Sequence, residues 1–152
     1  MPGSTFTIDP ILTSFVGIDI PGAMTGFFTE VSGAEITTEV VEHWTNSADG
    51  TKTIQRKVPG RTTYSDITLK RGLVSDNKEL YDWHKLVRDG KIKEARKNGS
   101  IFVLDQEHKE IARWNFEACW PSKVVLPSLS AESSSAIVEE VTLSVEFIER
   151  TK

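Results

Sequence analysis

The sequence predicts a mainly antiparallel β-barrel or β-sandwich that carries one flanking α-helix. Three observations lead to this fold class. Polar and apolar residues alternate along most of the chain, which is typical of half-buried strands. Only one segment, residues 75–91, repeats its apolar residues at helical spacing. Turn-forming residues recur about every ten residues, as they do in sandwiches and barrels.

Length and charge limit the class of protein further. A chain of 152 residues is expected to form a single domain, residues 1–152, with its own core. The net charge is −4, whereas a general nucleic-acid binder needs a basic excess. A single cysteine, Cys119, excludes an intramolecular disulfide and a cysteine-based zinc site within one chain. We therefore expect an ordinary globular domain that folds in a reducing compartment.

The first residues show no targeting pattern. Residues 1–22 lack a basic leading region, and Pro10 and Pro21 interrupt their apolar stretches. We expect neither a signal peptide nor a membrane span here.

Five strands are predicted. The first strand spans residues 27–44, with Gly33 as a candidate bulge, and a polar loop follows at 45–53. The second strand spans 62–70, with Ile67 and Leu69 on one side.

A hairpin and a final strand complete the predicted sheet. Residues 100–105 and 110–120 form the hairpin, and residues 137–150 form the last strand. In the hairpin, one apolar stripe is expected to contain Ala112, Trp114, Phe116, Ala118 and Trp120. In the last strand, the inward residues are expected to be Val141, Leu143, Val145 and Phe147. The Ser-rich residues 128–136 are predicted to form a loop.

The helix is predicted to pack on the barrel through one face. Asp76 is the expected N-cap, Glu79 the partner of a capping box, and Gly90 the residue that ends the helix. The packing face comprises Leu80, Trp83, Leu86 and Val87.

No catalytic, cofactor-binding or metal-binding residue is predicted. His43, His84 and His108 are scattered, and Cys119 has no recognisable base nearby in the sequence. Glu139 and Glu140 are adjacent on a strand, so they point to opposite faces and cannot act as a carboxylate pair. The motifs of serine hydrolases, zinc proteases and P-loops are missing from the sequence.

The stretch KVPGRTTYSDITLKRG, residues 57–72, is the best candidate for an anion site. A phosphate loop needs glycines that open a helix, whereas PGR here is expected to precede a strand and KRG to follow it. We therefore interpret the stretch as one barrel strand. The basic residues at its ends, among them Arg61, Lys70 and Arg71, suit contacts between subunits better than phosphate.

Several outward faces carry few charges. In the last strand, Thr142 and Ser144 alternate with Glu140 and Glu146. Such faces fit a sheet that continues into another chain or lines a water-filled interior, but they also fit an ordinary solvated face.

Five segments carry a resemblance to a known family. They are EVSG (30–33), VPGR (58–61), ITLKRG (67–72), LYDWHK (80–85) and ARWNFEACWPSKV (112–124). Their order and spacing resemble the tail tube proteins of contractile phages and of extracellular contractile injection systems. The ring-forming tube protein of type VI secretion is more distantly similar. The resemblance runs from about Phe15 to Arg150, and Ala34 departs from it because the family commonly has a larger apolar residue there.

The resemblance implies a structural protein without an active site. It implies hexameric rings that stack into a hollow inner tube, which a contracting sheath drives through a target envelope. The implied partners are further copies of the chain, the sheath protein, baseplate and tail-terminator or cap proteins, and luminal cargo. Neither membrane insertion nor sequence-specific nucleic-acid binding is expected. Assembly in the cytoplasm would precede incorporation into a phage tail or a tail-like particle.

Two sets of residues follow as hypotheses about assembly. The lumen is expected to be lined by Glu35, Thr37, Glu39, Thr142, Ser144 and Glu146. Contacts between rings or subunits are expected from Asn46, Ser47, Asp49, Gly50, Arg61, Lys70 and Arg71.

Three other functions stay open at this point. A secreted ring of the type VI kind that carries effectors, or a baseplate-proximal protein that initiates the tube, would share the fold. A small β-barrel hydrolase or binding domain would require a pocket with convergent polar groups, for which the sequence offers no candidate residues.

Overall fold

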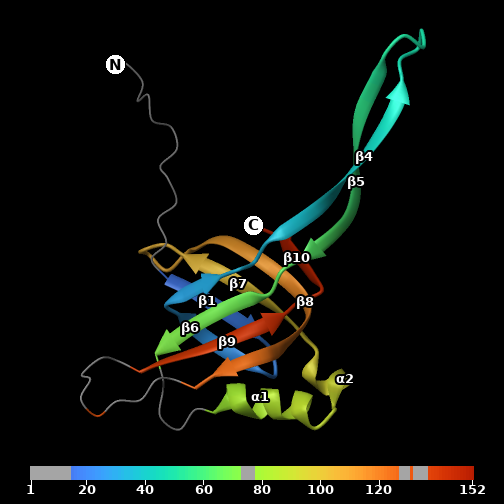
Figure 1. Ribbon diagram of the computed structural model, residues 1–152. Helices are drawn as coiled ribbons and strands as arrows, with labels where there is room; N and C mark the ends of the chain where they lie inside the picture. The colour runs from blue at the N-terminus through green and yellow to red at the C-terminus, as the bar shows by residue number, and fades with distance from the viewer. Residues whose placement is uncertain (1–14, 73–77, 127–130, 132–136) are drawn as a thin grey trace, which may run out of the picture.

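A computed structural model describes residues 15–72, 78–126, 131 and 137–152, and shows a curved β-sheet body with a long projecting hairpin (Figure 1). The body strands are β1 (Phe15–Ile20), β2 (Met24–Phe28), β3 (Glu30–Ser32), β6 (Ile67–Gly72), β7 (Lys97–Leu104), β8 (Glu110–Val125), β9 (Val138–Ser144) and β10 (Phe147–Arg150). The body also contains the helices α1 (Glu79–Arg88) and α2 (Ile92–Ala95). The hairpin, called the arm below, consists of β4 (Ile36–Asn46) and β5 (Thr53–Tyr64).

The body sheet is antiparallel and curls back on itself. Its strand order is β2-β1-β7-β8-β9-β6-β3, and β10 pairs with β8. Only Thr29 separates β2 from β3, so one continuous stretch of chain contributes to both ends of the sheet. The Thr29 amide donates to the Lys70 carbonyl oxygen at 2.9 Å. The mainly antiparallel β-class is therefore confirmed, as a strongly curved sandwich rather than a continuously hydrogen-bonded barrel.

The core lies inside the curved sheet and beneath α1. Leu80 and Trp83 are buried from the helix side, whereas Leu86 and Val87 are half-buried. The Trp83 indole Nε1 donates to the Ala95 carbonyl oxygen at 2.7 Å, which ties α1 to α2. Leu86 packs against this core, so three of the four predicted packing residues contact it, and for Val87 the packing stays a prediction. The second helix was not predicted because its four residues are too few for a periodic pattern.

The C-terminal end of α1 was predicted correctly, whereas its N-terminal end was not. Gly90 has φ +80 and its amide donates to the Val87 carbonyl oxygen at 3.1 Å, so the predicted stop is confirmed. At the other end, α1 begins after Lys78, which makes no side-chain capping bond. The prediction of Asp76 as the N-cap is therefore wrong, and Asp76 itself lies outside the described residues. Glu79, the predicted capping-box residue, forms an ion pair with Arg71.

The predicted first strand is three strands. The chain turns away from the body at Gly33, whose φ of +85 is unfavourable for residues with a side chain. A Cβ atom at Gly33 would lie 2.6 Å from the Asp66 carbonyl oxygen, so the close approach also requires glycine.

The stretch 57–72 is likewise not one strand. β5 ends at Tyr64 in the arm and β6 begins at Ile67 in the body sheet, so the stretch crosses between two sheets. The interpretation of this stretch as a single barrel strand is therefore wrong. Alternation alone did not reveal the change, because Ser65 and Asp66 preserve the period.

Irregularities in two other strands change which residues face the core. Ala118 has φ +53, and the register shifts between the pairs Gly99↔Phe116 and Lys97↔Cys119. Cys119 is consequently buried, and the predicted stripe through Ala118 and Trp120 is wrong beyond Phe116.

The last predicted strand is also interrupted. A bend separates β9 from β10, so Ile148 is buried while Phe147 is exposed. Val141, Leu143 and Val145 face the core as predicted, whereas the inward placement of Phe147 is wrong.

Candidate assembly surface

The arm projects from the body, and no other part of the described subunit packs against most of its length. β4 and β5 pair from Ile36↔Tyr64 at the base to Asn46↔Thr53 near the tip, and they project far from the body (Figure 1). None of their residues is buried. Within the described residues, β4 and β5 pair only with each other, so both outer edges of the arm are unpaired.

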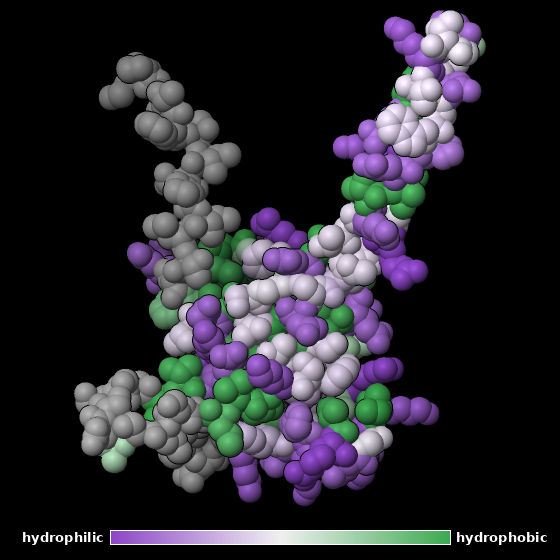
Figure 2. Space-filling view, viewed as in Figure 1, coloured by the Kyte–Doolittle hydropathy of each residue, from purple (hydrophilic) through white to green (hydrophobic). Residues whose placement is uncertain are grey.

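Apolar side chains occupy both faces of the arm. Val41 pairs with Val58 on one face, and Val40 pairs with Pro59 on the other, because neighbouring residues of a strand alternate in direction. The exposed large apolar residues of the arm are Ile36, Val40, Val41, Trp44, Ile54 and Val58. Apolar groups therefore lie among polar ones along the exposed arm (Figure 2).

The PGR sequence forms a bulge within β5. Thr38 pairs with Thr62, whereas Val40 pairs with Pro59, so β5 contains one extra residue between these pairs. A Cβ atom at Gly60 would lie 2.9 Å from Val41 Cγ2, which explains the glycine. The expectation that PGR precedes a strand is wrong, and proline is tolerated here because β5 is an edge strand with a bulge.

Ser65 fixes the base of the arm. The Ser65 amide donates to the Glu35 carbonyl oxygen at 2.9 Å, and the Glu35 amide donates to Ser65 Oγ at 2.8 Å. Ser65 Oγ also donates to the Gly33 carbonyl oxygen. The Tyr64 and Phe147 rings, 5.5 Å apart between centroids, add a contact between arm and body. These bonds constrain the direction in which the arm leaves the body.

The tip of the arm is ordered by one carboxylate. Asp49 Oδ1 accepts bonds from Ser47 Oγ at 2.5 Å, from the Thr51 amide at 3.1 Å and from Thr51 Oγ1 at 2.8 Å. The Ser47 hydrogen bond, followed by those of Thr51, lowers the pKa of Asp49 to about 2. The tip residues predicted for contacts, Asn46, Ser47, Asp49 and Gly50, thus lie at and beside a defined turn at the far end of the arm.

An apolar cavity of about 560 Å³ lies at the foot of the arm. Its lining includes Val16, Ile36, Ile101, Val103, Trp114 and Ile148, and Thr29 and Glu30 supply polar groups. The cavity was not predicted from the sequence, because its residues come from separate strands that only the curved sheet brings together.

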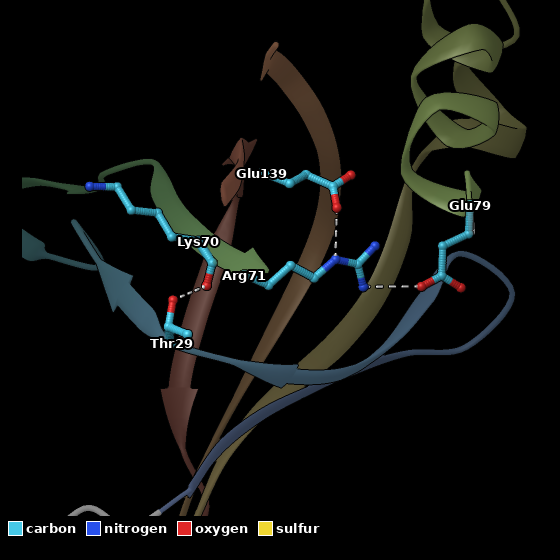
Figure 3. Close-up of polar contacts among 5 residues, drawn as sticks. All are labelled: Thr29, Lys70, Arg71, Glu79 and Glu139. Carbon is cyan, nitrogen blue, oxygen red and sulfur yellow. Dashed lines mark hydrogen bonds and ion pairs between the residues drawn. The ribbon is translucent and has the colours of Figure 1, made fainter. Parts of the chain in front are cut away.

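Arg71 belongs to the interior rather than to the surface. It is only 7% exposed, and its Nε lies 3.1 Å from Glu139 Oε2 (Figure 3). Its Nη1 lies 3.3 Å from Glu79 Oε1 at the start of α1. We therefore withdraw Arg71 from the predicted subunit contacts. Lys70 stays on the surface and lies 3.5 Å from Glu30.

The residues predicted for the lumen lie in three places, the third of which is the bend that contains Glu146. Thr142 and Ser144 lie on the outward face of β9, whereas Glu35, Thr37 and Glu39 lie at and near the base of the arm.

The outward face of β9 is not purely acidic. Glu140 pairs with Lys70, and Thr142 pairs with Lys123, so basic residues flank the strand. Glu146 lies in the bend after β9, 3.8 Å from Arg96.

No catalytic arrangement emerges among the described residues. His43, His84 and His108 lie on β4, on α1 and in the β7–β8 turn, respectively, and no group of three His, Cys, Asp or Glu could hold a metal ion in the described ranges. Burial raises the pKa of the Cys119 thiol to about 12, so it is not a thiolate at neutral pH. No helix in the described part of the chain is long and apolar enough to cross a membrane.

A body with its own core and a projecting arm with exposed apolar side chains and unpaired strand edges are features of a structural subunit that assembles with other chains. The chain belongs to the T4-like virus tail tube protein gp19 family, whose pattern matches residues 14–149. It is therefore a tail tube protein, and the predicted resemblance is confirmed.

Solved structures share this fold. A chain of the PVC sheath–tube complex in its extended state, from an extracellular contractile injection system, is 23% identical with a TM-score of 0.79; the match covers 93% of this chain and 91% of that chain. A chain from the anti-feeding prophage cap is 20% identical with a TM-score of 0.75, covering 97% and 98%. Hcp1 from Salmonella typhimurium is 15% identical with a TM-score of 0.60, covering 91% and 86%. A search of curated proteins found no match.

Proposed function

We propose that the chain builds the inner tube of a contractile injection particle, as hexameric rings that stack around a channel. The observation that carries the proposal is the arm, whose apolar faces and strand edges are uncovered in the single subunit. A two-stranded hairpin is marginally stable alone in water, and exposed edges readily pair with other chains. Further copies of the same chain are the simplest cover for such an arm.

The similar structures suggest the other partners. They come from a sheath–tube complex, a tube terminator, a tube cap and a baseplate. We propose that this chain likewise contacts a sheath along its tube and baseplate and cap or terminator proteins at the ends. Assembly in the cytoplasm would precede incorporation into a phage tail or tail-like particle.

The outward face of β9 is our candidate for the lumen wall. Thr142 and Ser144 make it polar, and Lys70 and Lys123 beside Glu140 leave it nearly balanced in charge. A balanced polar wall would bind passing cargo weakly, whatever its charge. Glu35, Thr37 and Glu39 remain candidates where the arm base meets this wall.

Electron microscopy of the purified protein across a concentration series tests the proposal. We expect rings and stacked tubes from the wild type, and we expect Val41→Lys to prevent them, because it introduces a charge into the exposed apolar pair with Val58. Leu126→Lys is the matched control, since it makes the same type of change at an exposed position of the body.

Three outcomes are informative. Wild-type protein that stays monomeric even with sheath and baseplate proteins present would contradict the proposed tube. Normal tubes from Val41→Lys would contradict the role of the arm but would leave the proposed tube intact. Short stacks in place of long tubes would indicate a tube initiator near the baseplate.

A further inference from the structure

The arm and the cavity at its foot present complementary features. Trp44, the largest apolar residue on the arm, is 61% exposed. The cavity measures about 560 Å³ and is lined mainly by Val, Ile, Phe and Trp side chains. Dry apolar cavities of roughly 150 Å³ already hold benzene, so this one has room for an indole ring and its neighbours. Exposed tryptophans that enter such pockets are frequent energetic centres of interfaces.

A polar group is available for the indole nitrogen. A buried tryptophan usually donates its N–H to an acceptor. Among the cavity-lining residues, Glu30 has a carboxylate whose side chain is 55% exposed, even though it also lies 3.5 Å from Lys70. The cavity therefore offers both the apolar surface and the acceptor that a tryptophan needs.

Trp44 lies far from the cavity of its own subunit. Ile36 at the base of β4 lines the cavity, and Trp44 lies eight residues farther along the same strand, 36 to 44. At about 3.4 Å per residue the two are roughly 27 Å apart. The β4–β5 ladder extends the arm away from the body, and the hydrogen bonds of Ser65 hold its base, so the indole lies far from the cavity of its own subunit.

The spacing fits an adjoining copy. A body of about 100 residues has a radius of gyration of about 13 Å, so the centres of touching copies lie roughly 30 Å apart. This distance matches the separation between Trp44 and the cavity. Different patches of one subunit then meet head to tail, which is the type of contact that generates closed rings or helical stacks.

We infer that Trp44 of each subunit inserts into the cavity at the arm base of an adjoining copy. The inference rests on the proposed function and specifies one of its contacts. It assigns the cavity an occupant, a second copy of this chain, and gives the arm its main anchor.

Substitutions on each side of the contact test the inference. Trp44→Ala should raise the protein concentration needed for assembly about 30-fold or more, a loss typical of an interface hot spot. Trp44→Phe should raise it less. Val103→Phe should block assembly by filling the cavity from within, and Val16→Phe provides a second filling variant should the first fold poorly. Val138→Phe, the same enlargement at an exposed position, is the control.

Mixing the two types of variant tests the direction of the contact. Trp44→Ala retains an open cavity and Val103→Phe retains the tryptophan. Each variant alone lacks the contact, whereas their mixture can form it once per unlike pair. We expect heterodimers in sedimentation experiments, together with a blue shift of tryptophan emission that is lost when the Val103→Phe partner also carries Trp44→Phe.

The outcomes separate the inference from the proposed function. Wild-type tubes with unchanged assembly of Trp44→Ala would overturn the inference and leave the tube intact. Loss of tubes in both filling variants but not in Trp44→Ala would show that another segment occupies the cavity, which also overturns it. Failure of the wild type to assemble with its partner proteins would remove the proposed function first, and the inference with it.

Discussion

Two pairs of strand residues show how differently the body and the arm are stabilised. Leu69 and Val141 are partners on β6 and β9, and they are 0% and 1% exposed. Val41 and Val58 are partners on β4 and β5, and they are 45% and 47% exposed. Both pairs have the same antiparallel geometry and similar side chains.

The difference between the pairs lies in what covers them. Fully burying such a side chain contributes about 1.5–3 kcal/mol, which the body gains within one subunit. The arm forgoes much of this gain until another chain covers it. A subunit built in this way folds first and gains further stability on assembly, so its arm is suited to joining copies.

The largest effect on the body should follow from Trp83→Ala. The ring is only 2% exposed, and its removal leaves a cavity beneath α1 and an unpaired Ala95 carbonyl oxygen. We expect the free energy of unfolding to fall by about 3–5 kcal/mol. Urea unfolding of the unassembled subunit measures this. Trp83→Phe, which keeps most of the ring but not the hydrogen bond, should cost clearly less, and equal losses would contradict the packing argument.

Arg71→Ala should rank next, at about 3 kcal/mol. It would leave Glu139, which is 2% exposed, without its buried cation, and breaking a buried ion pair from one side is costly. The double substitution Arg71→Met with Glu139→Leu should recover most of the loss, because an apolar pair needs no counter-charge. Thermal unfolding of the wild type, of Arg71→Ala and of the double variant compares their stabilities. A double variant no more stable than Arg71→Ala would refute this explanation.

A smaller effect is expected where body and arm meet. Gly33→Ala should cost about 1–2 kcal/mol from the left-handed backbone alone, and more from the 2.6 Å approach to Asp66. Gly50→Ala is the matched control, because Gly50 also has positive φ but its added Cβ would meet nothing within 4 Å. Denaturant unfolding should show the larger loss for Gly33→Ala. Because the backbone at Gly33 directs the arm, tube assembly should suffer as well.

The smallest effect should be local to the tip and depend on pH. The pKa of Asp49 is lowered from 3.8 to about 2, so the ionised carboxylate supports the turn above pH 3.8 and loses this role as the pH falls through about 2. We expect amide exchange at Thr51 to stay slow at pH 4 and to become faster, relative to the intrinsic rate, near pH 2. Asp49→Asn should remove this pH dependence while leaving global unfolding unchanged. A pH-independent Thr51 amide in the wild type would contradict the role of Asp49.

The sequence determined the elements whose neighbours in the chain enforce them. The apolar spacing of Leu80, Trp83 and Leu86 predicted a helix and its buried face, and Gly90 predicted its end. The alternation of Val141, Leu143 and Val145 predicted the inward residues of β9 and of the bend that follows it. Five short segments in a fixed order also indicated the tail tube family, which the match over residues 14–149 confirms.

Only the tertiary structure decided where the strands break and what their outer faces meet. Gly33 and Ser65 redirect the chain between two sheets without disturbing the alternation, so the arm is invisible to periodicity. Arginine is usually a surface residue, yet Arg71 is buried where β9 and α1 bring the carboxylates of Glu139 and Glu79 against it. Local pattern records how a residue relates to its neighbours in sequence, whereas burial depends on partners that are distant in sequence or lie in another copy of the chain. That is why the sequence predicted a tube protein, and why the arm, the cavity and the inferred contact between them required the three-dimensional arrangement.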